Sequence, residues 1–138
     1  MNEPTTAPNS DEKWLICFRV TGTPKAQPRP RAVSMGGRAR MYDPGTADEW
    51  KQDIIQQGHH KLPKQPFACP LAVRLIFYLP RPQRLSRKAD PSHALPCTAK
   101  PDVDNLAKST MDAMTEAGWW TDDALVAELH VVKLYAAK

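Results

Sequence analysis

Prolines and glycines divide this 138-residue chain and leave two stretches that suit long helices. The first runs over about residues 46–57, carries apolar residues at helical spacing and stops at Gly58. The second runs over about residues 103–117 and is closed by Gly118, because glycine readily adopts the left-handed conformation that follows many helices. The proline-punctuated stretch 80–101 is expected to be a long loop between them.

Three apolar segments have the composition of β-strands. Residues 14–20 predict one strand, and residues 125–134 predict the last. Residues 71–79 give the strongest signal, and their apolar density predicts a central place in the sheet. Glycines at 36 and 37 predict the tip of a hairpin. We therefore expect an α/β fold of the α+β type: one compact domain with a mixed β-sheet and two main helices.

The composition indicates a globular protein of a reducing compartment. Hydrophobic residues make up 41% of the chain and charged residues 25%, which is near the globular average. No apolar run approaches the roughly 18 residues of a membrane span, and the first dozen residues are too polar for a secretory signal. The three cysteines form no CxxC pair, which argues against a disulfide scaffold and a zinc ribbon. We expect a flexible N-terminal arm over 1–12 and a single domain over 13–138.

Charge is distributed unevenly along the chain. Residues 102–128 contain seven acids and one lysine, so this segment carries −6 while the rest of the chain carries +10. A basic body around an acidic patch suits a phosphate polymer together with a divalent metal ion. Solvated charged faces without a ligand are the alternative interpretation.

Two aspartates at the start of the second expected helix can share a ligand only if the first lies outside that helix. Pro101 favours this arrangement, because it keeps the chain extended before the first turn and thereby separates Asp102 from the helical Asp104. Lys108 follows one turn later on the same face as Asp104. Asp112 lies about 12 Å along the axis, too far to bind the same ion, and is left out of the predicted site.

After Gly118 the chain can reverse and bring Asp122 and Asp123 back beside the helix start. Side chains alternate along an extended segment, so one of this pair is expected to face the site. Three carboxylates from separate local structures would suit Mg²⁺, which could activate a water and neutralise charge on a phosphodiester. The alternative is structural: Asp102 as a plain N-cap, Asp104 and Lys108 as a surface pair, and the last two acids as turn residues.

Other residues give weaker signals. Two adjacent tryptophans, Trp119 and Trp120, are expected to be core or interface anchors rather than platforms for bases. His59 and His60, or His93 with Cys97, could be considered for a transition metal, but neither pair has the number of ligands that zinc needs.

The segment from Lys100 through Lys133 closely resembles the RusA family of Holliday junction endonucleases. The shared pattern is D-x-D-N-x-x-K, then D-A, then a G-x-W-x-D-D turn and a last strand, nearly without gaps over about 35 residues. The segments Val-Thr-Gly-Thr-Pro at 20–24 and Pro-Arg-Pro-Arg at 28–31 also resemble the opening of many phage-type members. Some members have a run of arginines before the first aspartate, whereas here Lys100 alone precedes Pro101.

The resemblance implies a homodimeric, Mg²⁺-dependent endonuclease of bacterial or prophage origin that nicks four-way DNA junctions symmetrically in recombination and repair. Mn²⁺ is expected to substitute for Mg²⁺, and the protein is expected in the cytoplasm with the nucleoid. The family's metal-binding aspartates fall on Asp102, Asp104 and Asp123, and its catalytic lysine falls on Lys108. Basic residues of the loops are the expected DNA phosphate contacts: Arg29, Arg31, Arg81, Arg84, Arg87, Lys88 and Lys100.

Two other functions stay open from the sequence. One is a non-catalytic protein that binds junctions or single strands, against which the intact acidic set argues, since acids facing phosphates weaken simple binding. The other is a nuclease that acts on flaps or forks.

Overall fold

A computed structural model describes residues 14–28, 31–36, 38–42 and 45–138 of the chain. The expected N-terminal arm, residues 1–12, lies outside the described residues. Within these residues, two α-helices, three short 3₁₀ helices and five strands follow one another in this order: β1 Arg31–Met35, β2 Arg38–Tyr42, α1 Asp48–Gly58, η1 His59–Lys61, β3 Leu71–Leu79, η2 Gln83–Leu85, β4 Leu95–Pro96, α2 Val103–Ala117, η3 Asp123–Leu125 and β5 Val126–Tyr135.

The main sheet has three strands in the order β3-β5-β4. Strand β5 runs parallel to β3, with Leu75 beside Val131, and antiparallel to the short β4. The sheet is therefore mixed, as predicted, but β5 is its central strand. The prediction that residues 71–79 lie centrally is wrong, because apolar density reports how well the faces of a strand are covered and not whether both of its edges are paired.

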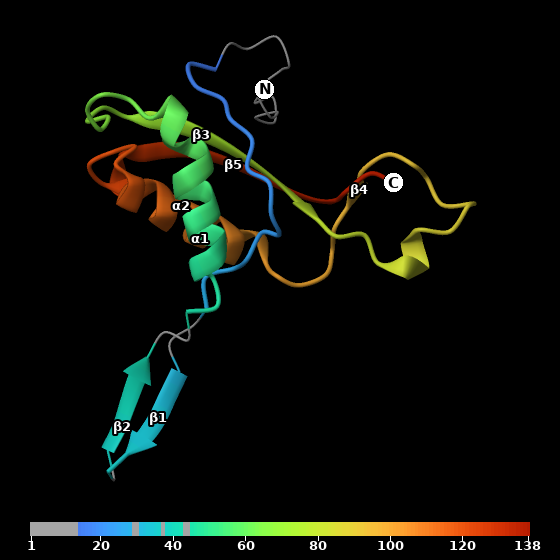
Figure 1. The fold of residues 1–138 in the computed structure, drawn as a ribbon, viewed down its shortest axis with the longest axis horizontal. Helices are drawn as coiled ribbons and strands as arrows, with labels where there is room; N and C mark the ends of the chain where they lie inside the picture. The colour runs from blue at the N-terminus through green and yellow to red at the C-terminus, as the bar shows by residue number, and fades with distance from the viewer. Residues whose placement is uncertain (1–13, 29–30, 37, 43–44) are drawn as a thin grey trace, which may run out of the picture.

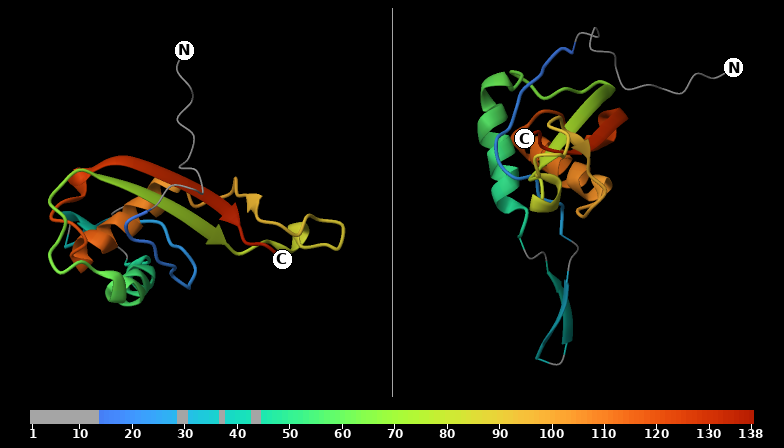
Figure 2. Two further views of the ribbon diagram at one scale, coloured as in Figure 1. Left: turned by 90° about the horizontal axis from the view of Figure 1, so that it is seen from above. Right: turned by 90° about the vertical axis from the view of Figure 1, so that its right-hand side faces the viewer.

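Both helices lie on one face of the main sheet (Figure 2), where α2 packs against β5 and α1 packs against α2. The core between these layers contains Ile54 of α1 and Leu106 of α2, both fully buried. The opposite face of the sheet is more open, with Ile76 42% and Tyr78 53% exposed on β3. The fold is thus a single α+β domain with two layers.

The two helices agree with their predicted positions because their boundary residues act locally. Helix α2 covers the predicted residues, and Gly118 follows it with φ 94° and ψ 24° in the left-handed region. The Gly118 N–H donates to Thr115 O, and Trp119 N–H donates to Met114 O at 3.1 Å, which completes a Schellman cap. Helix α1 begins two residues later than predicted and ends at Gly58.

Residues 14–20 do not form the predicted strand. The segment is extended, with alternating half-buried and exposed side chains, and is not paired with any strand of the described part of the chain. Its Phe18 ring stacks on Trp119 with centroids 5.2 Å apart, and its end is held by Gln57, whose Oε1 accepts from Thr21 N at 2.7 Å. A β-rich composition thus gave the extended backbone, while side-chain contacts replaced the hydrogen-bond ladder.

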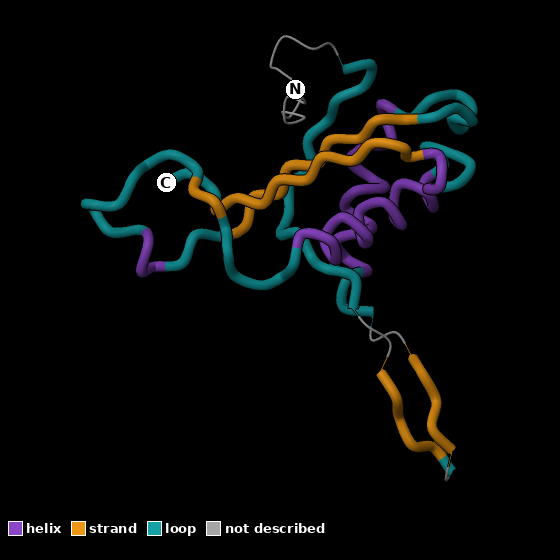
Figure 3. Tube along the Cα trace, turned by 180° about the vertical axis from the view of Figure 1, so that it is seen from behind, coloured by secondary structure: helices purple, strands orange, loops and turns teal. Residues whose placement is uncertain are grey.

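The predicted hairpin forms a separate two-stranded sheet. Strands β1 and β2 pair antiparallel from Arg31 beside Tyr42 to Met35 beside Arg38, and Gly36 occupies the tip with φ 60°. Figures 1 and 3 show this hairpin projecting away from the two-layered body. No helix in the described residues is both long enough and apolar enough to cross a membrane.

Candidate functional site

The start of α2 separates the first two aspartates, as Pro101 predicts. Asp102 occupies the N-cap position with extended backbone, φ −71° and ψ 147°, and its carbonyl accepts from Leu106 N at 3.1 Å. Its side chain makes no capping hydrogen bond, so the plain N-cap alternative does not describe it. The carboxylate instead contacts the Lys100 ammonium, with Nζ to Oδ1 3.0 Å and Nζ to Oδ2 3.1 Å.

A depression of about 430 Å³ lies between α2, η3 and β5. It brings together three of the four predicted catalytic residues: Asp104 and Lys108 from α2, and Asp123 from η3. Leu129 and Val131 of β5 are among the apolar residues of its lining. Asp102 is not part of the lining, so its carboxylate stands at the helix start while the others line the depression.

Asp112 also lines this depression, although the sequence analysis leaves it out. Its Oδ2 lies 3.8 Å from Lys108 Nζ, and the two side chains are 33% and 62% exposed. The surface pair expected between Asp104 and Lys108 is therefore replaced by a pair one turn further along α2. The signal was present in the i, i+4 spacing, which places all three residues on one face.

The turn after α2 decides which acid of the pair faces the depression. Asp122 caps η3, because its Oδ1 accepts from Ala124 N at 2.9 Å. Asp123 lines the depression, whereas Asp122 is not part of its lining. The turn is tied to Phe67, whose N–H donates to Trp119 O at 2.9 Å and whose carbonyl accepts from Thr121 N at 3.1 Å.

The tryptophans beside this turn are buried, each 3% exposed, and belong to the core as predicted. Trp120 Nε1 donates to Thr115 Oγ1 at 2.7 Å, so the ring also ties the turn to the last part of α2. These contacts fix the segment that carries Asp123.

Lys133 supports the residues just before Asp102, a role that the sequence does not predict. Lys133 of β5 donates from Nζ to Ala99 O at 2.5 Å and to Pro101 O at 2.8 Å. Both carbonyls belong to the turn that leads into Asp102, so this ammonium anchors the turn to the central strand. A lysine in a strand of mixed polarity gives no signal of such a role.

The donor set fits a hard divalent cation in part. Asp104 and Asp123 offer carboxylate oxygens to one depression, and Mg²⁺ typically takes one or two protein carboxylates and completes its shell with water and phosphate. In the described part of the chain, no group of three or more His, Cys, Asp or Glu side chains is placed so that it could hold a metal ion. The Asp102 carboxylate is paired with Lys100 and is not part of the lining of this depression.

The predicted DNA contacts fall into three groups. Arg29 lies outside the described residues, and Arg31 begins β1. Arg84, Arg87, Lys88 and Lys100 are exposed. Arg81 differs from them, because its guanidinium donates to four backbone carbonyls.

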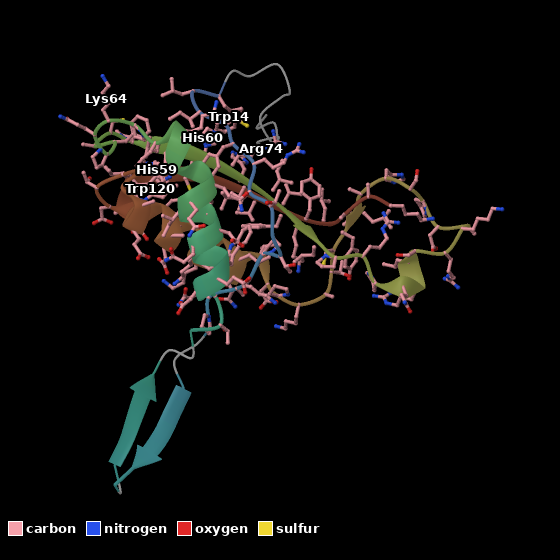
Figure 4. All side chains as sticks on the ribbon, in the orientation of Figure 1. Trp14, His59, His60, Lys64, Arg74 and Trp120 are labelled. Atoms are coloured by element: carbon pink, nitrogen blue, oxygen red, sulfur yellow. The ribbon has the colours of Figure 1, made fainter. Side chains whose placement is uncertain are left out.

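The other candidate metal ligands are dispersed over the fold. His59 and His60 are the first two residues of η1, which follows α1. Figure 4 shows them at the end of the molecule that lies opposite the loop of residues 80–96. His93 is exposed in that loop, whereas Cys97 is buried.

The buried Cys97 contacts Tyr135 instead. A hydrogen bond with the Cys97 thiol, together with burial, raises the pKa of the Tyr135 hydroxyl.

An α+β fold with an aspartate-lined depression, a lysine one turn along the helix and basic loops has the features that suit a nuclease. The family model for endodeoxyribonuclease RusA matches residues 21–138, and the chain belongs to this family of endodeoxyribonucleases.

Among its relatives, the uncharacterized protein YqaN of Bacillus subtilis (strain 168) is 33% identical over 127 residues, which cover 88% of each chain. The crossover junction endodeoxyribonucleases RusA of Escherichia coli (strain K12) and of Enterobacteria phage 82 are each 46% identical over 44 residues. Those 44 residues cover 32% of this chain and 37% of each of these two relatives.

Proposed function

We propose that this protein is a Mg²⁺-dependent, structure-specific endodeoxyribonuclease that resolves four-way DNA junctions by paired, symmetric phosphodiester cleavage in recombination and repair. The observation that supports this most is the convergence of Asp104, Lys108 and Asp123 on one depression. Two relatives bear the name of crossover junction endodeoxyribonuclease, which supports the choice of substrate.

In this proposal, the carboxylates of Asp102, Asp104 and Asp123 hold the metal ion. When bound, Mg²⁺ would supply an activated water and neutralise charge on the phosphodiester. Lys108 leaves its loose pair with Asp112 and donates to a phosphate oxygen, where an ammonium stabilises the charge that develops during cleavage. Lys133 keeps the turn before Asp102 in place, so that the first carboxylate stays near the helix start.

The binding of DNA in this proposal depends on exposed cations outside the depression. Arg84, Arg87, Lys88 and Lys100 contact backbone phosphates, which gives recognition of shape with little reading of bases. Arg29 and Arg31 stay on the list of proposed contacts from the sequence. If the Asp102 carboxylate turned away from Lys100 to hold the ion, the Lys100 ammonium would be free to bind a phosphate.

We further propose that the active form is a homodimer in the bacterial cytoplasm, associated with the nucleoid, in a cell or a prophage. A two-fold symmetric junction is best cut at paired positions by a two-fold symmetric protein. Mn²⁺ is expected to replace Mg²⁺, since both accept carboxylate oxygens in octahedral geometry.

A cleavage assay on a synthetic four-way junction tests the proposal. Mg²⁺ should give paired nicks that a ligase can seal, and EDTA should abolish them. Competition with flap, fork and linear duplexes should leave junction cleavage the strongest. Junction binding without metal-dependent nicks would favour a non-catalytic binder, and preferred cutting of flaps or forks would reassign the substrate.

Two adjacent acids provide a matched pair of variants for that assay. Asp123→Asn removes a carboxylate from the depression and should abolish cleavage. Asp122→Asn keeps an acceptor for Ala124 N and should retain cleavage. Equal effects of the two changes would contradict the assignment of the metal site to Asp123.

A further inference from the structure

Residues 80–96 form an arm at the end of the main sheet (Figure 1). The arm leaves β3, contains η2 and returns as β4, which pairs with the end of β5. Three exposed cations lie on it, namely Arg84, Arg87 and Lys88. Its one acid, Asp90, is 17% exposed, accepts from the Arg87 backbone N–H at 2.7 Å and lies 3.5 Å from Arg87 Nε, while the Arg87 side chain stays 75% exposed.

Arg81 fastens this arm from inside. Its Nε donates to Ala136 O at 3.0 Å, which joins the base of the arm to the residue after β5. The Nη1 group donates to two carbonyls, Leu85 O at 3.1 Å and Pro91 O at 2.6 Å. Nη2 donates to His93 O at 2.5 Å. Four of the five N–H groups of the guanidinium therefore have backbone acceptors, and at most one is left for a phosphate.

Lys138 provides a second set of tethers. Its backbone N–H donates to Ser92 O at 3.0 Å. Its ammonium donates to Arg87 O and Asp90 O, so Lys138 also holds the segment of the arm that follows η2. Most side chains of the arm are exposed, and among its described residues Leu85 and Leu95 pack against the core, so these polar contacts add to a small apolar contact.

We propose that Arg81 is a positioning residue that locks the arm, and that the locked arm is a phosphate-binding surface for a DNA duplex away from the catalytic depression. This rests on the proposed function and removes Arg81 from the direct contacts expected from the sequence. A locked arm presents Arg84, Arg87 and Lys88 in fixed positions, so less entropy is lost when phosphates bind.

The geometry requires arginine in particular. A planar guanidinium reaches carbonyls on several sides at once, whereas the ammonium of lysine is a single point on a flexible stem. Since at most one N–H of Arg81 is left, a direct phosphate contact would be a single bond, and lysine could make that bond with its charge kept. An arginine that donates to four backbone carbonyls should not be replaceable by lysine.

The test measures binding of a fluorescently labelled four-way junction in EDTA by anisotropy, so that no result depends on the metal site. Arg81→Lys and Arg81→Gln should both weaken binding about fivefold to tenfold, with an unchanged dependence on salt. Lys88→Gln, which removes a proposed direct contact, should lower the salt slope by about one. Trypsin should cut both Arg81 variants faster than the wild type within the arm.

Two further readouts separate positioning from loss of the fold. In cleavage with Mg²⁺, the Arg81 variants should raise KM while kcat changes less than about twofold, which general unfolding would not produce. Lys138→Met removes the two ammonium bonds of the second set of tethers, keeps its backbone bond to Ser92 O, and should weaken junction binding in the same direction.

Tight binding by Arg81→Lys would overturn the inference, as would a salt slope that falls by about one in Arg81→Gln, because either would make Arg81 a phosphate contact. Wild-type protein that does not bind the junction at all would instead refute the proposed function, and with it the purpose assigned to the arm.

Discussion

Replacement of Gly118 by alanine tests how the chain delivers Asp123 to the site. Gly118 has φ 94° and ψ 24°, and a Cβ built at this position meets no heavy atom within 4 Å. The cost is therefore backbone strain alone, roughly 1–2 kcal/mol for a residue with a side chain in the left-handed region. Alanine also lowers the conformational entropy of the unfolded chain, which stabilises the folded state by about 0.4–1 kcal/mol. The free energy of unfolding should therefore fall by about 1 kcal/mol in total.

Urea unfolding followed by tryptophan fluorescence measures this change, because Trp119 adjoins the substituted residue. The thermal midpoint should fall by about 3–5 °C. Gly118→Asn is the matched control and should lose less, since asparagine tolerates the left-handed region. An unchanged stability would refute the need for a left-handed residue here, and a loss above about 3 kcal/mol would contradict the free space around the Cβ.

Three further predictions concern the site and the core. Asp104→Asn should keep junction binding in EDTA and abolish cleavage in Mg²⁺, measured by anisotropy and by a nicking assay, because the change removes a metal-binding charge but no DNA contact. Lys133→Met should raise the Mg²⁺ concentration for half-maximal cleavage about tenfold, with weaker Mn²⁺ binding in electron paramagnetic resonance, and an unaltered Mn²⁺ affinity would remove its supporting role. Leu106→Ala should lower the free energy of unfolding by about 3–4 kcal/mol, since Leu106 is fully buried, and a loss below about 1 kcal/mol would contradict that burial.

Local chemistry made much of the fold predictable. Gly118 and Pro101 set the limits of α2 through their own backbone preferences, so its range followed from the sequence. The place of residues 71–79 did not, because the order of strands in a sheet depends on pairing between distant segments. Residues 14–20 show the same limit, since their extended form is local but a strand needs a partner edge.

The site was predictable where helical periodicity relates its members. Asp104 and Lys108 share one face of α2, and the turn after Gly118 returns Asp123 to it. The roles of Lys133 and Arg81 were not predictable, because their acceptors are backbone carbonyls from remote parts of the chain. Nothing in a local motif tells a cation that binds phosphate from one that binds carbonyls.

The most direct test of a shared divalent ion is anomalous diffraction from crystals of this protein soaked in Mn²⁺. A peak among the carboxylates of Asp102, Asp104 and Asp123 is expected, at about 2.0–2.3 Å from their oxygens, with Asp102 moved away from Lys100. A peak elsewhere, or full soaking with no ion between Asp104 and Asp123, would contradict the metal-dependent mechanism.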